Sequence, residues 1–308
     1  MATTTSITTT YAGEFAGKYI AAALLSADTI DKGLIEVKPN VKYKEVIKKL
    51  AIDDIVANAT CDFGATSTVT LTERVLQPEE FQVNLQLCKK DFRSDWEAIQ
   101  MGYSAYDNLP ANFSDFLIAN IAGKVAQKTE QTIWAGVNAT AGEFDGFTTL
   151  FAADASVLDV TGTTVTAANV IEEMGKVMDA VPSALYGKED LTIYVPQNVA
   201  KAYVRALGGF GAAGLGAAGT DAKGTQWYGN QPLFFDGVRV AMVNGLPSNK
   251  MVAAQSSNLY FGTGLLSDHN EVKLLDMGDL DGSQNVRVIM RYTAGVQYGI
   301  GSEVVYYA

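Results

Sequence analysis

The chain has 308 residues, of which 48% are hydrophobic, and it contains 29 glycines but only 7 prolines. As one compact body, a chain of this size buries about three quarters of the surface that it exposes when unfolded, and its composition argues against intrinsic disorder. Its formal net charge of −11 opposes binding to nucleic-acid phosphates, which argues against a protein that reads DNA or RNA sequence.

Residues 1–38 are interpreted as a polar arm. They begin with a Thr-rich stretch that has neither a basic region nor a long apolar core, so no secretory signal peptide is expected. The longest apolar run, from Ile20 to Leu25, is far too short to span a bilayer, and no membrane partner is expected. The segment has too few apolar residues to build a core of its own, which is typical of an extended arm.

Residues 39–90 are predicted to form a long two-stranded excursion. From Val41 onward, apolar side chains alternate with lysines, which predicts a strand with one apolar and one basic face. An isolated hairpin is only marginally stable in water, so this one needs a surface from elsewhere to lie on. The alternating apolar residues are Val41, Tyr43, Ile47, Val69, Leu71, Phe81, Val83, Leu85 and Leu87.

A long amphipathic helix is predicted within residues 91–150, with Asn112 as its N-cap and Gly136 as its C-terminal stop. Its apolar residues recur at three- and four-residue steps. They are Phe113, Phe116, Leu117, Ile121 and Val125.

Residues 151–266 read as an α/β region. Its first helix is predicted to have Thr166 as N-cap, with Val165 and Val170 forming a hydrophobic staple. The stretch "DLTIYVPQNVAKAYVRALGG" predicts a strand followed by a helix that starts at Pro196.

Further strands are predicted at residues 233–235, 238–243 and 251–261. The last segment, 285–307, is almost entirely β in composition and far exceeds the usual strand length, although its glycines are positions where it can divide or bend. A segment of this length must pair with something long.

No catalytic constellation stands out in the chain. The single histidine, His269, lies in a polar turn, and the two cysteines, Cys61 and Cys88, match no metal or redox spacing and are interpreted as free thiols. Asp276, Asp279 and Asp281 lie near a glycine but do not complete a calcium loop, so a turn is predicted there.

The stretch "GGFGAAGLGAAGT" contains two overlapping G-x-G-x-x-G matches, beginning at Gly209 and Gly214, with Asp236 downstream. A dinucleotide fingerprint must join a strand to a helix, whereas this stretch follows a predicted helix. A surface loop is therefore preferred over a nucleotide site, and no cofactor, metal site or enzymatic activity is expected.

The order of these elements resembles the Hong Kong 97 fold of tailed-phage major capsid proteins. Similar local stretches occur in the same order along nearly the whole chain: "TEQTIWAG", "FDGF", "DLTIYVPQNVAKAYVRAL", "MVAAQSSNLYFGTGLLSD" and "VRVIMRYTAGVQYGIGSEVVYYA". The resemblance implies an α+β capsid fold with an N-terminal arm (1–38), an extended β-hairpin E-loop (39–90), a P-domain with a long spine helix (91–150), an α/β A-domain (151–266) and a return to the P-domain with a long terminal strand (267–308).

The resemblance also implies a function: hexamers and pentamers that close into an icosahedral virion shell around double-stranded DNA, without sequence-specific binding. Such a chain would be made in the cytoplasm of a host bacterium. No long charged helical segment precedes the arm, so a separate scaffold protein is expected, along with portal and decoration proteins. The arm and the two long β segments are expected to bury their apolar faces mainly against sister molecules.

A specific contact between subunits is hypothesised. A basic face of the excursion would dock over the acid-rich start of the spine region of a neighbour and set the register of the contact. A solvated lysine face that protects an edge from aggregation is an equally good interpretation. The residues of the hypothesis are Lys42, Lys44, Lys48 and Lys49 on one side, and Asp91, Asp95, Glu97 and Asp107 on the other.

Two alternatives remain open on the sequence. An encapsulin-type nanocompartment shell would share the fold and differ mainly in its cargo. A soluble nucleotide-dependent α/β enzyme would use the loop from Gly209 to Gly219 and would remain a small oligomer.

Overall fold

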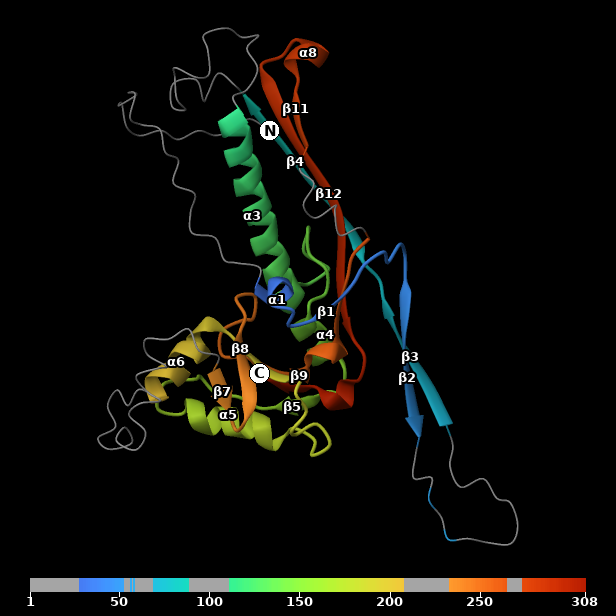
Figure 1. The fold of residues 1–308 in the computed structure, drawn as a ribbon, viewed down its shortest axis with the longest axis vertical. Coiled ribbons are helices and arrows are strands. Elements are labelled where there is room, and N and C mark those ends of the chain that lie inside the picture. The colour runs from blue at the N-terminus through green and yellow to red at the C-terminus, as the bar shows by residue number, and fades with distance from the viewer. Residues whose placement is uncertain are drawn as a thin grey trace.

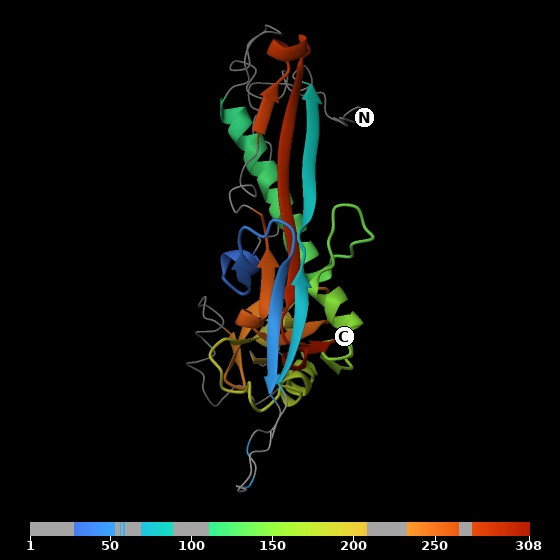
Figure 2. The same ribbon diagram turned by 90° about the vertical axis from the view of Figure 1, so that its right-hand side faces the viewer.

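The structure is a computed structural model that describes residues 28–52, 56, 58, 69–88, 111–207, 233–264 and 273–308. Within these ranges the chain forms three sheets, packed with helices into an elongated molecule (Figures 1 and 2). A rounded α/β body lies at one end, a long sheet with one long helix extends from it, and a two-stranded hairpin projects to the side.

The α/β body is built on a six-stranded sheet with the order β5-β13-β9-β6-β8-β7. Helices α5 (Val170–Asp179) and α6 (Gln197–Leu207) cover one face, and their apolar side chains share one buried cluster with that face. The strands are β5 (Leu158–Val160), β6 (Leu191–Val195), β7 (Leu233–Phe235), β8 (Val238–Met242), β9 (Met251–Gln255) and β13 (Val305–Tyr307).

The long sheet is organised around β12 (Asn285–Tyr298). Along one edge β12 pairs with β4 over ten successive residues, from Asn285 opposite Cys88 to Ala294 opposite Glu79. Along its other edge it pairs first with β11 and then with β10, and β10 pairs in parallel with β1. The strands that flank β12 are β1 (Glu36–Lys38), β4 (Glu79–Cys88), β10 (Leu259–Gly262) and β11 (Lys273–Asp276).

Helix α3 (Ala111–Ala135) runs beside this sheet and ends at the α/β body (Figure 1). Its last turn carries Ile133 and Trp134, which are fully buried. Trp134 packs against Phe147 of α4 (Phe147–Ala153) and against Tyr194 of β6, with ring centroids 5.4 and 5.1 Å apart. The main core therefore lies where the long sheet, α3 and the six-stranded sheet meet.

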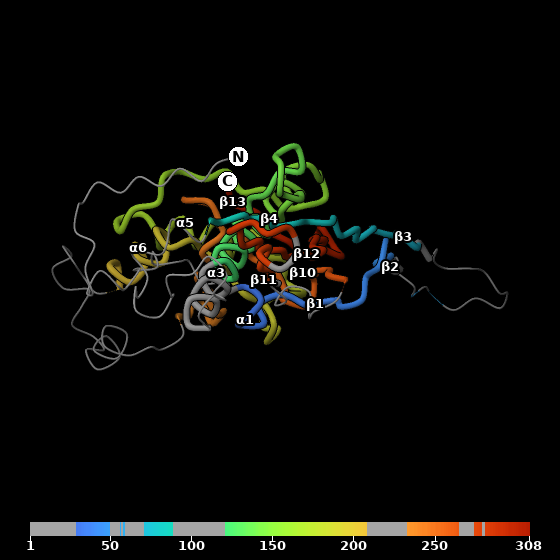
Figure 3. The backbone as a smooth tube through the Cα atoms, turned by 90° about the horizontal axis from the view of Figure 1, so that it is seen from above, coloured from blue at the N-terminus to red at the C-terminus, as the bar shows by residue number. Residues whose placement is uncertain are grey.

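The projecting hairpin consists of β2 (Glu45–Ile52) and β3 (Val69–Leu76), which pair with each other in a separate two-stranded sheet. Seen from above, the hairpin lies to one side of the rest of the molecule (Figure 3). Short helical turns complete the described elements: α1 (Asp28–Asp31), η1 (Ser256–Asn258), α8 (Gly278–Asp281) and η3 (Gly301–Glu303).

The terminal segment departs from its expected role. It pairs along its length with strands of its own chain, and one of them is β4, the second part of the predicted excursion, so the expectation that the long β segments bury mainly against sister molecules is wrong for this segment and for residues 79–88. It is also wrong for the described end of the arm, because Leu34 and Ile35 are buried in the main core of their own subunit. It also divides at Gly299 to Gly301 into β12 and β13, which belong to different sheets. The predicted strand 251–261 likewise splits into β9 and β10, because the turn at Ser256–Asn258 carries the chain from one sheet to the other.

Three predicted boundaries were wrong. The strand expected from Val41 begins at Glu45, because Val41 is buried and its N–H donates to the carbonyl oxygen of Thr263 at 3.0 Å. Asn112 lies inside α3, which already starts at Ala111.

Helix α5 begins later than expected. Thr166 precedes it by a turn, and its N–H and hydroxyl both donate to the Asn169 side-chain oxygen, at 2.7 and 3.0 Å. Thr166 is therefore not its N-cap. Val165 and Val170 are nevertheless both buried in the same apolar cluster.

Candidate assembly interface

The two faces of the projecting hairpin differ in composition. The register places Val46 opposite Val75 and Lys48 opposite Glu73, and because side chains alternate along a strand, these four share one face with Leu71. We call this set, Val46, Lys48, Leu71, Glu73 and Val75, the outer face. Its apolar members are unusually exposed: Val46 by 43%, Leu71 by 63% and Val75 by 40%.

The opposite, inner face of the hairpin looks toward the molecule itself. Ile47, Lys49, Thr72 and Arg74 line a hollow of about 380 Å³, together with Ser156 and residues of the turn that links β12 to β13, and Glu73 of the outer face reaches its edge. The hairpin thus has one face that belongs to its own subunit and one apolar face without a covering layer among the described residues. An exposed apolar patch on a projecting element is typical of a surface that binds another protein.

The four lysines of the sequence hypothesis do not share one face. Lys42 and Lys44 precede β2 and are exposed, and Lys44 lies 5.2 Å from the ring centroid of Tyr43, a side chain that is itself 70% exposed. Lys48 lies on the outer face and Lys49 on the inner face, because adjacent residues of a strand point in opposite directions.

The acidic half of that hypothesis, Asp91, Asp95, Glu97 and Asp107, lies outside the described residues, as do His269, Cys61 and the glycine-rich loop from Gly209 to Gly219. The described element before this stretch is α6, a helix, whereas the dinucleotide fingerprint follows a strand. Asp236 lies in the turn between β7 and β8, with a positive φ of 47°. Cys88, at the end of β4, is a free thiol.

The base of the hairpin rests on a polar cluster that the sequence did not reveal. The Asp154 carboxylate accepts hydrogen bonds from the Tyr298 hydroxyl at 2.6 Å and from the Ser156 N–H and hydroxyl at 2.8 and 2.9 Å. Burial raises the pKa of Asp154, but these bonds and one from Arg74 outweigh it and hold the pKa well below its usual range. Burial, followed by the bond to Asp154, raises the pKa of Tyr298. Asp154 is therefore a fixed negative charge.

Two of the stretches that carry the family resemblance meet at the end of α3. The carbonyl of Gly136, the last residue of "TEQTIWAG", accepts two hydrogen bonds. One comes from the N–H of Gly146, within "FDGF", at 3.0 Å, and the other from the hydroxyl of Thr149, two residues after that motif, at 2.7 Å. A Cβ on Gly136 would lie 2.3 Å from the Phe144 carbonyl oxygen, so only glycine allows this close approach. The two stretches are therefore parts of one contact between the end of α3 and the start of α4.

The segment that leads into β1 is attached to the same helix. The hydroxyl of Thr29 donates to Glu130 at 2.5 Å, its N–H donates to Glu130 at 3.2 Å, and the indole N–H of Trp134 donates to the Thr29 hydroxyl at 2.9 Å. Thr29, Glu130 and Trp134 have no exposed surface. This buried carboxylate therefore serves to fasten the start of the described chain to α3.

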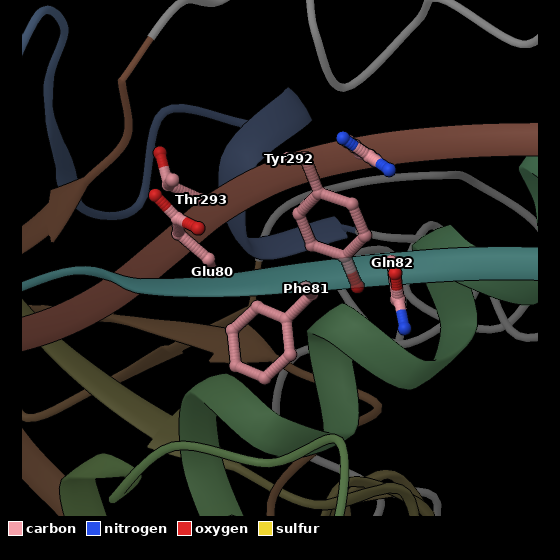
Figure 4. A pocket seen from close by; sticks show the side chains of 6 residues that line it. Glu80, Phe81, Gln82, Tyr292 and Thr293 are labelled. Atoms are coloured by element: carbon pink, nitrogen blue, oxygen red, sulfur yellow. The ribbon is translucent and has the colours of Figure 1, made fainter.

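A hollow of about 640 Å³ lies along β4 and β12 (Figure 4). Phe81 and Tyr292 are opposite each other across the ladder, with ring centroids 5.6 Å apart. The other lining residues are Glu80, Gln82, Arg291 and Thr293. The Thr293 hydroxyl oxygen accepts a hydrogen bond from the Gly264 N–H at 2.6 Å, so it is engaged in holding the fold.

The described residues form neither a metal-binding cluster nor a helix that could span a membrane. Within the described ranges, no group of three or more His, Cys, Asp or Glu residues is arranged to hold a metal ion. Asp276 and Asp281 each accept a backbone hydrogen bond in the turn between β11 and β12, from Gly278 and Ser283, which confirms the predicted turn. No helix in the described part of the chain is long and apolar enough to cross a membrane.

Comparison with known proteins gives a clear structural answer. No protein-family model and no curated protein matches the chain. Among solved structures, the capsid of a native GTA particle matches with a TM-score of 0.61 and 12% identity over 94% of this chain and 93% of that one. A structure from Mycobacterium phage Adephagia matches with a TM-score of 0.61 and 15% identity, over 94% and 91% of the two chains. The procapsid of satellite phage P4, which includes the size determination protein Sid, matches with a TM-score of 0.50 and 10% identity, over 91% and 96%.

These matches cover nearly the whole of each chain, so they concern the complete arrangement of α/β body, long helix, long sheet and hairpin. The chain therefore has the fold of phage major capsid proteins, the Hong Kong 97 type that its sequence resembles.

Proposed function

We propose that this chain is the major capsid protein of a tailed bacteriophage and that it assembles as hexamers and pentamers of an icosahedral shell around double-stranded DNA. The observation that carries the proposal is the match to phage capsid structures over more than nine tenths of the chain. Its place is the virion capsid, after synthesis in the cytoplasm of the host bacterium. The function is structural and not enzymatic.

The projecting hairpin is the main candidate for contacts between subunits. Its outer face exposes Val46, Leu71 and Val75, and none of these could be buried by its own body, because the inner face is the one turned toward it. A neighbouring subunit that covered this face would gain roughly 25 cal/mol for each Å² of apolar surface removed from water. Repetition of this contact around a ring would produce a closed capsomer.

The role proposed for each part of the chain follows from its resemblance to the Hong Kong 97 fold. Residues 1–38 act as the arm, 39–90 as the E-loop, 91–150 as the P-domain with α3 as its spine helix, 151–266 as the A-domain and 267–308 as the return to the P-domain. A separate scaffold protein, a portal and decoration proteins are the proposed partners. The presence of the Sid protein in the matched P4 procapsid gives one example of an additional protein bound to such a shell.

Lysines at the start of the hairpin are proposed to set the register of the contact. Lys42 and Lys44 are exposed and precede β2 in the sequence, and they would pair with the acidic segment that contains Asp91 and Asp95 on a neighbour. Exposed ion pairs contribute only about 0 to 1 kcal/mol each, so they would select a register while apolar contact supplies affinity.

A double charge reversal, Lys42→Glu with Lys44→Glu, tests this register role. It should impair shell assembly without unfolding the subunit, as measured by electron microscopy and thermal melting. The matched control is Lys201→Glu with Arg205→Glu, two exposed cations on α6. Normal shells from the Lys42 and Lys44 variant would refute this part of the proposal.

The function as a whole is tested by sizing the purified protein and imaging it in negative stain. Closed shells tens of nanometres across, with five- and six-fold capsomers, are the expected result. A monodisperse dimer that binds a nucleotide would overturn the proposal in favour of an α/β enzyme. Shells that enclose a protein cargo and no DNA when isolated from their natural source would favour an encapsulin-type compartment.

A further inference from the structure

One side chain connects the hairpin to two other segments of the subunit. The guanidinium of Arg74, on the inner face of β3, forms an ion pair with Asp154, just after α4. Its Nε donates to the carbonyl oxygen of Gly299 at 3.1 Å, and its Cζ lies 4.2 Å from the ring centroid of Tyr298. The planar guanidinium group suits such a site because its N–H groups donate hydrogen bonds in a fixed, forked geometry while its plane stacks on an aromatic ring. A lysine ammonium group cannot do both.

The groups that receive Arg74 are themselves held in place. The side-chain oxygen of Asn258 accepts bonds from the N–H groups of Gly299 and Ile300 at 3.1 and 2.8 Å, so the turn that presents the Gly299 carbonyl is fixed. Asp154 is fixed in turn by bonds from Tyr298 and Ser156. The groups that receive Arg74 are therefore held by bonds that do not involve the hairpin.

The turn also has no room for larger residues. A Cβ at Gly301 would lie 2.1 Å from the Ser156 hydroxyl oxygen and 3.3 Å from Nη2 of Arg74. The glycine therefore lets the backbone approach the cluster closely, which is a reason for this residue at this place.

Arg74 supplies a second attachment level along β3. The first is at its end, where Leu76 is fully buried and packs against Gly262 of β10 and where the Gln297 side chain donates to the Val75 carbonyl oxygen at 3.2 Å. Arg74 lies two residues farther out on the same face, roughly 6–7 Å along the strand. A strand held at one level can pivot about it, whereas a strand held at two levels has a defined direction.

We propose that Arg74 is a positioning residue for assembly: by binding Asp154, the Gly299 carbonyl and the Tyr298 ring, it sets the direction in which the hairpin projects from the free subunit. This inference rests on the proposed capsid function, because the outer face then meets a neighbour in an orientation prepared in advance. Without the anchor, only a fraction of subunits present the hairpin correctly at any time. If that fraction is about one in ten, the apparent affinity of each contact falls about tenfold.

The direct test measures the direction of the hairpin in the unassembled subunit. Spin labels are placed at Val56, which is 90% exposed near the hairpin tip, and at Ile171 on α5, which is 52% exposed, in a background without the two native cysteines. Pulsed electron resonance then gives the distribution of distances between the labels. Arg74→Met keeps the apolar stem and should broaden the distribution clearly, Asp154→Asn should do so partly, and the control Arg205→Met should not.

The second measurement is the subunit concentration at which shells appear. Arg74→Met should raise it about tenfold, as expected for a binding-competent fraction of one tenth, whereas Arg205→Met should leave it unchanged. Thermal melting of each variant shows whether the body remains folded. Should Arg74→Met fail to fold, Asp154→Asn and Arg74→Lys carry the same comparison, because each retains part of the site.

The outcomes separate this inference from the capsid proposal. A distance distribution for Arg74→Met as narrow as that of the unchanged protein would overturn the anchor, whatever the protein assembles into. An unchanged assembly threshold in a folded Arg74→Met subunit would overturn the role in assembly. If the unchanged protein forms no shells, the capsid proposal fails, while the distance measurement still decides whether Arg74 directs the hairpin.

Discussion

The hydroxyl of Tyr307 offers a sharp test of how the α/β body is held together. It donates to the Glu173 carboxylate at 2.6 Å and accepts from the Thr163 N–H at 2.8 Å, and Tyr307 itself is fully buried. Tyr307→Phe removes only this oxygen. A hydrogen bond to a charged group contributes about 1.5–3 kcal/mol, and an unpaired buried N–H adds to the loss, so we expect a cost of about 2–4 kcal/mol in the free energy of unfolding.

The cost should depend on pH. The Tyr307 hydrogen bond is the main cause that lowers the pKa of Glu173; burial opposes it, and bonds from Lys176 and Thr163 assist it. Because the folded-state pKa lies below the unfolded one, the stabilisation is fully present above the ordinary glutamate pKa of about 4.3 and is lost as the pH falls through the lower, folded value. The stability gap between the two proteins should therefore be largest near neutral pH and shrink in acid.

Urea unfolding of unassembled subunits at neutral pH and at acidic pH values below the ordinary glutamate pKa measures both quantities. Tyr186→Phe is the matched control, because it also removes a tyrosine hydroxyl that donates a hydrogen bond, but the acceptor is the Asp236 carbonyl at 3.0 Å and Tyr186 is 58% exposed. We expect the control to change stability by no more than about 0.5 kcal/mol. A Tyr307→Phe effect as small as the control, or one that does not change with pH, would show that the reasoning is wrong.

Three further substitutions probe the joints of the fold. Gly245→Ala should prevent folding or shift the backbone, because its Cβ would lie 2.0 Å from the Glu130 carbonyl oxygen, and circular dichroism would detect the loss. Thr29→Val removes the hydroxyl that donates to Glu130 and accepts from Trp134, so it should cost about 2–3 kcal/mol in urea unfolding and leave the indole more mobile in fluorescence quenching. Leu76→Ala should cost about 2–5 kcal/mol by leaving a cavity at the base of the hairpin, and hydrogen exchange should rise there first.

Much of the local structure was predictable from short-range patterns. The helix after "TIYVP" begins at Gln197, one residue after the start predicted at Pro196, and the predicted strand before it is present as β6. The long helix ends at Ala135, beside the predicted stop at Gly136. These features depend on neighbours within a few residues, which a single sequence displays.

The sequence did not correctly predict which side chains share a face of the hairpin. Alternation from Val41 suggested a strand that starts there, with four lysines on one face, but the strand begins at Glu45 and separates Lys48 from Lys49. The pattern could not show that the Val41 N–H donates to the carbonyl oxygen of Thr263, just after the distant strand β10, or that Val41 is buried. The candidate interface therefore changed from a basic face to an apolar one.

What the sequence determined by itself is the identity and order of most elements, because propensity, period and end signals act within a few residues, and this order was enough to suggest the capsid fold. Only the tertiary structure decided which elements pair and where the polar side chains meet. Arg74, Asp154 and Tyr298 lie far apart in the chain, and nothing local to any of them indicates the other two. Such contacts arise when packing brings distant segments together, and burial then strengthens the hydrogen bonds between them. The partners in these bonds cannot be identified from the residues next to them in the sequence.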